Sequence, residues 1–513
     1  MILIFPFILG SLSVFSFQPF NFTYINFLIF PLIFLITVYV QKKSKSTYRK
    51  KPYLFNIFLI GYLFGIGFFL SGTHWISNSL SFDENLKYLI PISIITLPLF
   101  LGLFFGFANL LSGPFIKNNF VSILFFSASY AFLDFVRSKI LSGFPWNLWG
   151  YTWSWLPEVL QPLKIVGLFS FNLISITLFC LPLLLIFKKK SYFVIFSLIS
   201  FIFFSNYIYG SLILNQNKKY LSSFNNKESL LNLKIVSPNF DLKYNLTNKD
   251  TEKLITDLIK YSDPHSDKKT IFIWPEGIFA GVNLKSIKNY KPLLKKNFSP
   301  NHLILFGINQ TELINGEEKI FNSLIVVNNN FDKIYEYKKR KLVPFGEFLP
   351  IENIFNKFGL KKITHGYGSF SKGEEQQLFN IYDFKILTLI CYEIIFPELS
   401  KTIDEKNLII NISEDAWFGK SIGPYQHFSK AIYRAIENDV FVARAANKGI
   451  SAFINNKGVI KKNLSPNETG AIEMSIPIIK NSSKKYKKDL IFFILLFTYV
   501  FIFVSNKKLN EQK

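Results

Sequence analysis

The sequence FKILTLICYE, residues 384–393, places a short apolar run directly before a cysteine, a tyrosine and a glutamate. A run of Ile, Leu and Thr this short, after the turn-like residues Asn380–Asp383, is typical of a buried β-strand. Cys391 therefore stands at a strand end, whereas the second cysteine, Cys180, lies within a long apolar segment. A lone cysteine is more often a small buried hydrophobic residue than a nucleophile, so its interpretation depends on other segments.

Two further segments place charged side chains at the ends of predicted strands. TIFIWPE, residues 270–276, ends on Glu276, and YKKRKLVPFGE, residues 337–347, contains four consecutive basic residues. Alone, the first is best read as a turn acid or helix N-cap, and the second as solvated charges. With Cys391 they supply a carboxylate, an ammonium and a thiol. Acyl transfer through a thioester needs these groups as base, oxyanion stabiliser and nucleophile.

The order of these motifs carries a family resemblance. WPE at 274–276, KRKLVPFGE at 339–347 and CYE at 391–393 resemble the Glu-Lys-Cys triad of the nitrilase superfamily. The VPFGE form and the flanking membrane segments are similar to its apolipoprotein N-acyltransferase branch, and the resemblance covers essentially the whole chain. It implies that Glu276 is the general base, that Lys339 is the cation and that Cys391 is the nucleophile.

The same resemblance implies supporting residues around the triad. Glu347 would hold Lys339 or assist the incoming amine, and Glu393, preceded by Tyr392, would position the loop after the nucleophile. No step in this chemistry requires a metal or a cofactor, and the sequence shows no metal-ligand spacing, phosphate loop or dinucleotide fingerprint.

Possible substrate contacts rest on weaker matches. NISEDAWFG, residues 411–419, is similar to a family segment that ends in WFG and supplies Trp417, but Glu414 stands where relatives more often have Asn. Tyr244 occupies a position near the acyl-chain entrance where relatives often carry Trp. His427 invites a role as a base, yet the resemblance gives it a structural or substrate-positioning part.

Composition indicates a membrane protein of several parts. The 513 residues are 50% hydrophobic, with a mean hydropathy of +0.26, which is too apolar for an ordinary soluble protein. A membrane span needs about 20 apolar residues. We expect a membrane domain at 1–214 with seven transmembrane helices, a polar domain at 215–489, and an eighth helix and tail at 490–513. The expected helices are 2–16, 24–41, 54–72, 88–108, 119–136, 162–187, 192–214 and 490–506.

Lysine and arginine residues orient this arrangement. Basic clusters follow the second, sixth and eighth expected helices, at 42–51, 188–190 and 507–513. The positive-inside rule assigns them to the cytoplasm, which puts 215–489 on the periplasmic side of a bacterial inner membrane. The net charge of +24 is thus explained largely by topogenic lysines, and no nucleic-acid module is recognisable.

The polar domain alternates strand-like and helix-like segments. Strands are expected near 232–238, 270–274, 302–308, 321–328, 385–390, 407–412, 440–445, 450–455 and 470–475, and helices at 249–262 and 424–438. This pattern predicts an α/β domain whose sheets are covered by helices. The resemblance narrows it to the α-β-β-α sandwich of nitrilases. In the membrane domain, the segment 140–157 carries aromatics typical of a membrane interface and reads as a re-entrant or interfacial loop.

The expected activity follows from the resemblance. Cys391 would take an acyl chain from a phospholipid, phosphatidylethanolamine in the first instance, and pass it to the N-terminal amine of a diacylglyceryl-cysteine on an apolipoprotein. Two alternatives stay open at this point. One is a membrane-tethered nitrilase-type amidase, and the other is a non-catalytic receptor or transporter with a nitrilase-like ectodomain. The intact triad and the scarcity of charges within the spans argue against the second.

Overall fold

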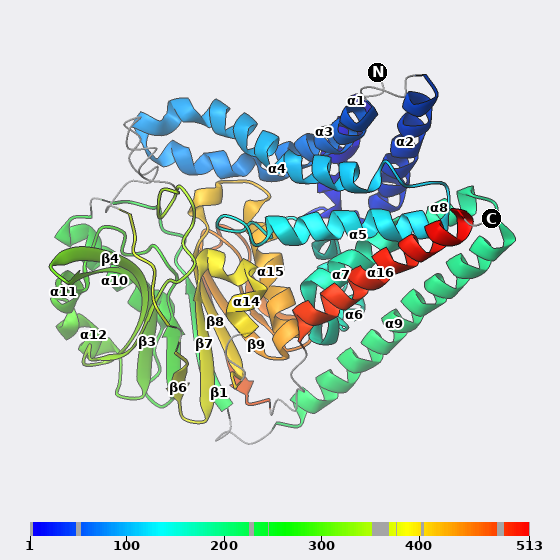
Figure 1. Cartoon of the computed structure of the whole chain (residues 1–513). Helices are drawn as coiled ribbons and strands as arrows, with labels where there is room; N and C mark the ends of the chain where they lie inside the picture. Colours follow the sequence, from blue (N-terminus) through cyan, green and yellow to red (C-terminus); the bar gives the residue numbers. More distant parts are fainter. Residues whose placement is uncertain are drawn as a thin grey trace. The chain divides into compact units, whose positions relative to one another are not determined.

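The chain forms two compact units in the computed structural model, which describes residues 4–47, 53–224, 230–244, 246–350, 369–375, 377–401, 405–479 and 487–511 (Figure 1). The first unit comprises Met1–Ser77, Tyr88–Asn215 and Lys485–Lys513, and the second comprises Asn78–Lys87 and Gln216–Lys484. Residues 78–87, expected within the membrane domain, belong to the second unit. Arg49, Lys50, Lys51 and Lys513 of the basic clusters lie outside the described residues.

The first unit is helical because its long uncharged segments can satisfy their backbone only within a helix once water is excluded. Its helices are α1 (Ile4–Leu12), α2 (Asn26–Thr47), α3 (Tyr53–Thr73), α4 (Ile90–Ser112), α5 (Phe120–Arg137), α6 (Pro157–Leu160), α7 (Leu163–Phe179), α8 (Pro182–Ile186), α9 (Lys190–Ser222) and α16 (Lys488–Glu511). Among the described residues, 7 helical segments are long and apolar enough to cross a membrane.

The first expected span differs from the other seven. The apolar helix at Ile4–Ser16, formed by α1 and the 3₁₀ turn Ser13–Ser16, is shorter than the about 20 residues that a span needs. Each of the remaining expected helices corresponds to a segment of sufficient length, with α7 and α8 together occupying 163–186.

The segment between α5 and α7 packs its aromatic rings inward. Trp146 and Trp149 are buried, and the Trp149 ring stacks on Phe68 with centroids 4.7 Å apart. These two tryptophans fill the interior of the helical unit and are not surface aromatics, and the interpretation of the segment as a re-entrant or interfacial loop stays a prediction. Irregular backbone at membrane depth is tolerated where protein surrounds it in this way.

A buried polar network anchors the same segment. The Arg137 guanidinium pairs with Asp134 at 2.8 Å and donates to the Phe144 carbonyl at 2.6 Å. The Asn172 amide donates to Asp134 at 3.0 Å and accepts from the Gly150 N–H at 3.0 Å. The network thus connects α5, α7 and the irregular segment between them.

The second unit contains two six-stranded sheets. The first has the order β12-β1-β2-β3-β4-β5 and the second β11-β10-β9-β8-β7-β6. Each sheet has three parallel strands in its centre and antiparallel strands beside them. The parallel strands are β1, β2 and β3 in the first sheet and β7, β8 and β9 in the second. The strands are β1 (Leu230–Ser237), β2 (Thr270–Ile273), β3 (His302–Ile314), β4 (Glu317–Asn328), β5 (Lys333–Lys338), β6 (Phe379–Ile381), β7 (Phe384–Ile390), β8 (Leu408–Glu414), β9 (Phe441–Asn447), β10 (Ser451–Ile454), β11 (Ile460–Leu464) and β12 (Gly470–Pro477).

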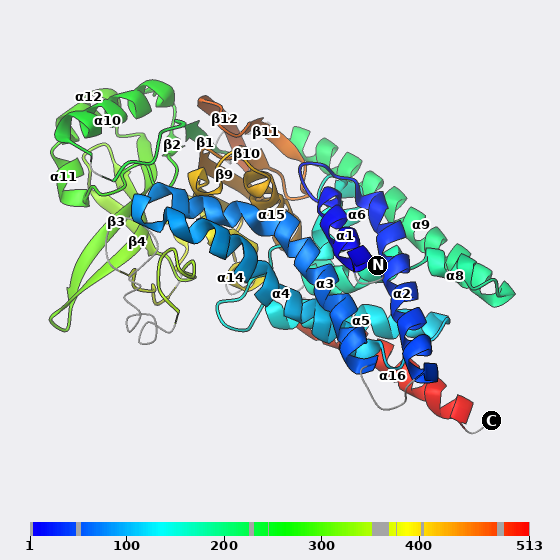
Figure 2. The same cartoon turned by 90° about the horizontal axis from the view of Figure 1, so that it is seen from above.

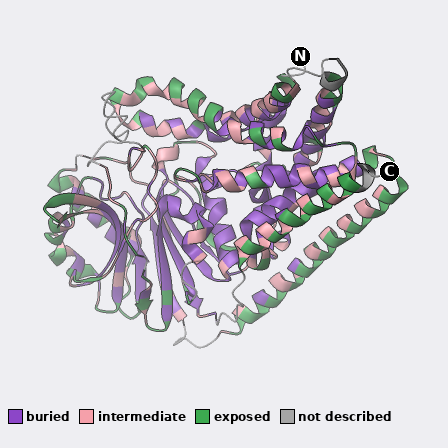
Figure 3. Ribbon diagram, in the orientation of Figure 1, coloured by how far each residue is buried: buried purple, intermediate pink, exposed green. Residues whose placement is uncertain are grey.

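The two sheets pack face to face and helices cover their outer faces. Strand β1 contacts β9 and β10 across the interface, and β4 contacts β7. The helices α10 (Asn248–Ser262), α11 (Leu284–Lys288) and α12 (Lys291–Asn297) lie on the first sheet, and α14 (Pro397–Lys401) and α15 (Gly423–Asn438) lie on the second (Figure 1 and Figure 2). The strands are largely buried because both of their faces are covered (Figure 3). This arrangement confirms the expected α-β-β-α sandwich.

The hairpin of β3 and β4 is longer than the sequence pattern indicated. It closes on Asn315-Gly316, whose φ angles of 54° and 82° suit the two-residue turn that favours Asn-Gly. The outer half of the hairpin is partly exposed and lacks a continuous apolar run. The expected strands, 302–308 and 321–328, therefore covered only its apolar inner half. Strands β6 and β11 were likewise not expected, and β5, whose end the sequence placed at the lysine segment, had no expected bounds.

Candidate active site

The three motif residues each follow the last residue of a strand of the second unit. Glu276 follows β2 through Trp274-Pro275, Lys339 directly follows β5, and Cys391 directly follows β7. The first two strands belong to one sheet and β7 to the other, so the sandwich brings the three residues together. The Lys339 Nζ lies 3.6 Å from Glu276 Oε1, and both charges act on the Cys391 thiol.

The Lys339 ammonium is buried between two carboxylates. Its side chain is 1% exposed, and Nζ donates to Glu347 Oε1 at 2.9 Å in addition to its pairing with Glu276. Burial alone would lower the pKa of Lys339, but the charges of Glu347 and Glu276 outweigh burial and raise it. The ammonium is therefore a fixed positive charge in a site that largely excludes water.

Asn322 completes this arrangement, and sequence reasoning missed it. It lies within β4, and its amide Nδ2 donates to Glu276 Oε1 and to Glu347 Oε1, both at 2.8 Å. Its backbone carbonyl also accepts from the Lys339 N–H at 2.8 Å. One side chain therefore spaces the two carboxylates on either side of the ammonium. Asn322 is one of several polar residues in β4, so no signal in the sequence singled it out.

Cys391 is a buried neutral thiol on a strained backbone. Its φ of 48° lies in the left-handed region, which residues with a Cβ seldom adopt. Burial raises the pKa of the thiol, Glu276 raises it further, and Lys339 opposes them, with the net shift upward. Ser413 also lowers this pKa. The resting thiol therefore keeps its proton, and a carboxylate that can accept that proton stands nearby.

Glu393 joins the lysine segment to the cysteine segment. Its Oε1 accepts from the Tyr337 hydroxyl and from the backbone N–H groups of Arg340 and Lys341, at 2.8, 2.8 and 3.0 Å. Its Oε2 accepts from the Ile390 N–H at 2.8 Å. The carboxyl is buried, so these four donors fix the chain on both sides of the site. The neighbouring Tyr392 is also buried, and its ring packs edge-on against Phe396 at 5.0 Å.

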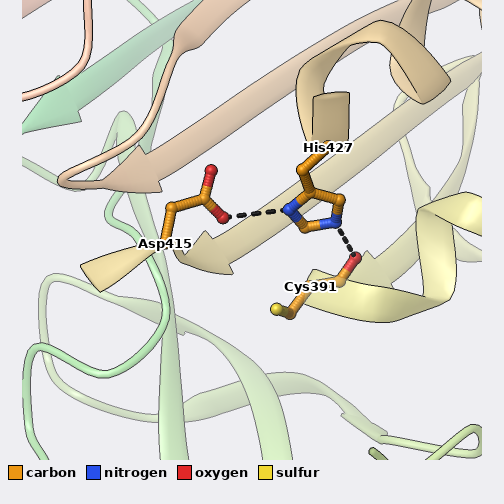
Figure 4. Close-up of side chains that lie close together, drawn as sticks. All are labelled: Cys391, Asp415 and His427. Carbon is orange, nitrogen blue, oxygen red and sulfur yellow. Dashed lines mark hydrogen bonds and ion pairs between the residues drawn. The ribbon is translucent and has the colours of Figure 1, made fainter. Parts of the chain in front are cut away.

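His427 lies behind the nucleophile, on α15. Its Nδ1 is 3.0 Å from Asp415 Oδ1 and its Nε2 is 3.3 Å from the Cys391 carbonyl oxygen, as Figure 4 shows. The ligand atoms of these three residues lie within 4.8 Å of one another, a spacing that a metal ion would suit. The Arg444 guanidinium already supplies the positive charge there, 2.8 Å from Asp415 Oδ2.

Glu414 and the aromatic residues beyond it form the adjoining loop. The backbone N–H of Glu414 donates to Glu276 Oε2 at 3.0 Å, and its own carboxyl accepts from the Ala416 N–H and the Asn447 amide at 2.9 and 2.8 Å. Burial raises the pKa of the Glu414 carboxyl, and Glu276 also raises it. A protonated carboxyl is a neutral group, like the Asn that relatives are expected to carry at this position.

Tyr244 and Trp417 are neighbours with ring centroids 6.3 Å apart. The Trp417 ring also meets Phe82, with centroids 4.9 Å apart, and the Asn78 amide donates to the Phe418 carbonyl at 2.8 Å. The segment 78–87 thus packs against the loop that carries Trp417, which explains its place in the second unit.

Comparison with known proteins identifies the family. Residues 9–181 match the family described as Apolipoprotein N-acyltransferase N-terminal domain, and residues 295–482 match Carbon-nitrogen hydrolase. The apolipoprotein N-acyltransferase of Rickettsia prowazekii is 32% identical over 480 residues, covering 92% of this chain and 91% of the relative. The chain belongs to the apolipoprotein N-acyltransferase family.

Other family members are similarly close. The proteins from Rhizobium leguminosarum and Rickettsia bellii are 29% and 31% identical over 478 and 459 residues, covering 91% and 88% of this chain and 88% and 89% of theirs. Among solved structures, an amidase from Nesterenkonia sp. is 14% identical with a TM-score of 0.37, covering 52% of this chain and 98% of its own. The carbon-nitrogen hydrolase match includes Lys339 and Cys391 and begins after Glu276.

Proposed function

We propose that this protein transfers an acyl chain from a phospholipid, through a thioester on Cys391, to the N-terminal amine of a diacylglyceryl-cysteine on an apolipoprotein. Family membership supports the acyltransferase activity, and the apolar helices support its location in a membrane. Phosphatidylethanolamine is the proposed donor. The observation that carries the mechanism is the buried Lys339 ammonium, held by Glu276 and Glu347 beside the strained Cys391.

In the first half-reaction Glu276 accepts the thiol proton as the sulfur attacks the donor's ester carbonyl. Lys339 stabilises the oxyanion, a type of contact that contributes about 3 kcal/mol in other enzymes. The carbon–oxygen bond of the ester breaks, and Glu276 returns the proton to the departing alkoxide, so a lysophospholipid leaves. Because the Cys391 pKa is raised by burial, proton transfer accompanies attack and does not precede it.

In the second half-reaction the lipoprotein amine attacks the thioester. Glu276 takes a proton from the nitrogen, Lys339 again stabilises the oxyanion, and the carbon–sulfur bond breaks to give an amide and the free thiol. Glu347 keeps Lys339 in place, and Glu393, next to Tyr392, holds the backbone before the nucleophile and after Lys339 through its bonds to N–H groups. Two substrates that use the same groups in turn give a ping-pong scheme.

We assign the aromatic residues Tyr244, Trp417 and Phe82 to contacts with the acyl chain. All three are partly exposed, and Tyr244 and Phe82 each neighbour Trp417, which lies on the loop that follows Glu414. Flat apolar rings suit a flexible hydrocarbon, which offers no hydrogen bonds.

The catalytic unit is proposed to lie on the periplasmic side of a bacterial inner membrane. The basic clusters support this orientation through the positive-inside rule. Parity supports a single side for the whole second unit: residues 78–87 belong to the same unit as 216–484, and the intervening spans are α4, α5, α7 with α8, and α9. An even number of spans returns the chain to the same side. A cytoplasm-dependent reporter fused after Lys219 should be silent, and strong activity there would contradict the orientation.

The decisive experiment is intact-protein mass spectrometry after incubation with phosphatidylethanolamine and no acceptor. Wild-type protein should gain one acyl group that hydroxylamine removes, and so should Cys180→Ala. Cys391→Ala should gain none, and Cys391→Ser should be nearly inactive because a hydroxyl is far harder to ionise than a thiol. Adding a diacylated lipopeptide should discharge the adduct to an N-acyl product. Release of free fatty acid instead would favour the amidase alternative, and an adduct on Cys391→Ala would refute the mechanism.

A further inference from the structure

The backbone of Cys391 needs a restraint that the proposed triad does not provide. A left-handed φ at a residue with a Cβ persists only where its surroundings impose it, and such residues cluster at functional sites. Glu276 and Lys339 face the thiol, and Glu393 binds the preceding Ile390 N–H. The Cys391 carbonyl points in another direction, towards the His427 Nε2 at 3.3 Å.

The hydrogen bond to this carbonyl determines the state of the ring. A carbonyl oxygen only accepts, so a hydrogen bond to it requires the proton on Nε2, although Asp415 Oδ1, also an acceptor, lies 3.0 Å from Nδ1. Burial, reinforced by Arg444, lowers the pKa of His427 to about 4, so the ring is neutral at ordinary pH and, with the proton on Nε2, its Nδ1 is an acceptor. The Arg444 Nη2, which only donates, lies 3.0 Å from Nδ1. The same Nη2 also lies 3.1 Å from Asp415 Oδ1, so one donor faces both acceptor atoms, which are themselves 3.0 Å apart.

A chain of buried groups holds the imidazole in this orientation. Arg444, on β9, pairs with Asp415 and hydrogen-bonds the Asn411 side chain on β8. The Asn411 amide donates to the Leu389 carbonyl on β7 at 3.1 Å, two residues before the nucleophile. The Phe418 ring meets the imidazole edge-on at 5.4 Å. All three parallel strands of the second sheet therefore contribute to fixing His427.

The network also reaches the sulfur. The Ser413 hydroxyl donates to Asp415 Oδ1 at 2.7 Å and lowers the pKa of the Cys391 thiol. His427 and Ser413 therefore belong to one network, in which the first contacts the Cys391 backbone and the second affects its thiol.

We propose that His427 is a positioning residue for Cys391, whose Nε2–H holds the carbonyl of the left-handed residue and so aims the sulfur between Glu276 and Lys339. This role rests on the proposed function of Cys391 as the nucleophile. His427 does not act as the base, because its Nε2 is directed at the backbone oxygen. The Arg444 guanidinium makes a metal ion at this cluster superfluous.

The test uses the full-length protein in the Cys180→Ala background and compares His427→Gln with His427→Asn. A Gln side chain that follows the path of the ring can place its amide N–H near the position of Nε2, whereas the shorter Asn amide reaches only the region of Nδ1. The probe is p-nitrophenyl butyrate, and nitrophenolate release in a single turnover reports acylation. Mass spectrometry verifies that the label is on Cys391, and thermal unfolding shows whether each variant is folded.

The acylation rate at saturating ester should fall about 100-fold in His427→Asn, the loss typical of a misplaced reacting group, and less than about 10-fold in His427→Gln. The ester concentration at half-maximal rate should stay unchanged in both. Equal rates in the two variants, or a change confined to that concentration, would overturn the proposal. Wild-type acylation by this ester without acylation by phospholipid would refute the proposed function and leave this inference standing.

A spectroscopic measurement on the wild-type protein shows which ring nitrogen of His427 carries the proton, without relying on folded variants. The chain has 5 histidines, so ¹⁵N-histidine labelling gives few signals. The ring that stays neutral down to about pH 4 should carry its proton on Nε2. A proton on Nδ1 of that ring would refute the hydrogen bond to the Cys391 carbonyl.

Discussion

Replacing Lys339 by Met should abolish acylation and lower the Tm by several degrees, whereas the same change at its neighbour Lys338 should do neither. Lys339 Nζ lies 2.9 Å from Glu347 and 3.6 Å from Glu276, and the side chain is 1% exposed. Lys338 is 27% exposed, pairs with Glu312 at 2.5 Å and lies over the Phe321 ring at 4.3 Å. The two residues are adjacent in sequence and carry the same charge, so they form a matched pair.

The magnitudes follow from burial. Removing one partner of a buried ion pair costs about 3–5 kcal/mol, because the remaining charges are left uncompensated. Here two carboxylates bridged by Asn322 would remain. An exposed pair contributes only about 0–1 kcal/mol. At about 2 °C per kcal/mol for a domain of this size, Lys339→Met should lower the Tm by about 6–10 °C, and Lys338→Met by no more than about 2 °C.

Thermal unfolding in detergent and the acyl-enzyme assay together test this expectation. Lys339→Met should form no thioester, whereas Lys338→Met should acylate at close to the wild-type rate. Lys339→Arg should be nearly as inactive as Lys339→Met, since a planar guanidinium does not fit a site shaped for a compact ammonium. If Lys338→Met abolished acylation and Lys339→Met did not, both the motif assignment and the burial argument would be refuted.

Three further predictions concern other parts of the molecule. Tyr337→Phe should lower the free energy of unfolding by about 1.5–3 kcal/mol, because a hydrogen bond to the Glu393 carboxyl disappears, yet it should still form acyl-enzyme. Glu393→Ala should form none, and mass spectrometry together with unfolding distinguishes the two variants. Burial lowers the pKa of Lys339, but its carboxylate partners raise it above the unfolded value. The stabilising effect of the ammonium is therefore complete below a pH of about 10 and is lost as pH rises further. Above that pH, the Tm of the wild-type protein should fall more steeply than the Tm of Lys339→Met. Arg137→Met should destabilise the helical unit by about 3–5 kcal/mol, since Asp134 loses its buried partner; an unchanged Tm would contradict this.

The fold could be predicted from the sequence wherever apolar periodicity was strong. The α/β sandwich and seven of the long apolar helices correspond to runs such as 384–390 and 88–108, in which burial on one or both faces dictates composition. Periodicity failed where a strand is exposed. The outer part of β3 and β4 and the lysine-rich β11 are held by cross-strand hydrogen bonds, which leave no apolar pattern.

The candidate site could be predicted in its motifs but not in its connections. Glu276, Lys339 and Cys391 stand at strand ends that sequence reasoning located, and motif order suggested that they meet. Asn322 and Arg444 contact these elements from the middle of strands, where a polar residue has no local signal for its partner. Their roles depend on which strands are neighbours in space, and that information is not local in the sequence.

The segment 78–87 has a consequence for how the second unit is made. Asn78 donates to a carbonyl 340 positions later in the chain, so the ribosome produces this segment long before the loop that receives it. The unit can reach its final form only after most of the polypeptide has been synthesised and the intervening helices have been inserted. An excised fragment beginning at Gln216 would lack the ring that covers Trp417 and the amide that caps Phe418. A soluble version of this unit should therefore carry residues 78–87 as a grafted segment.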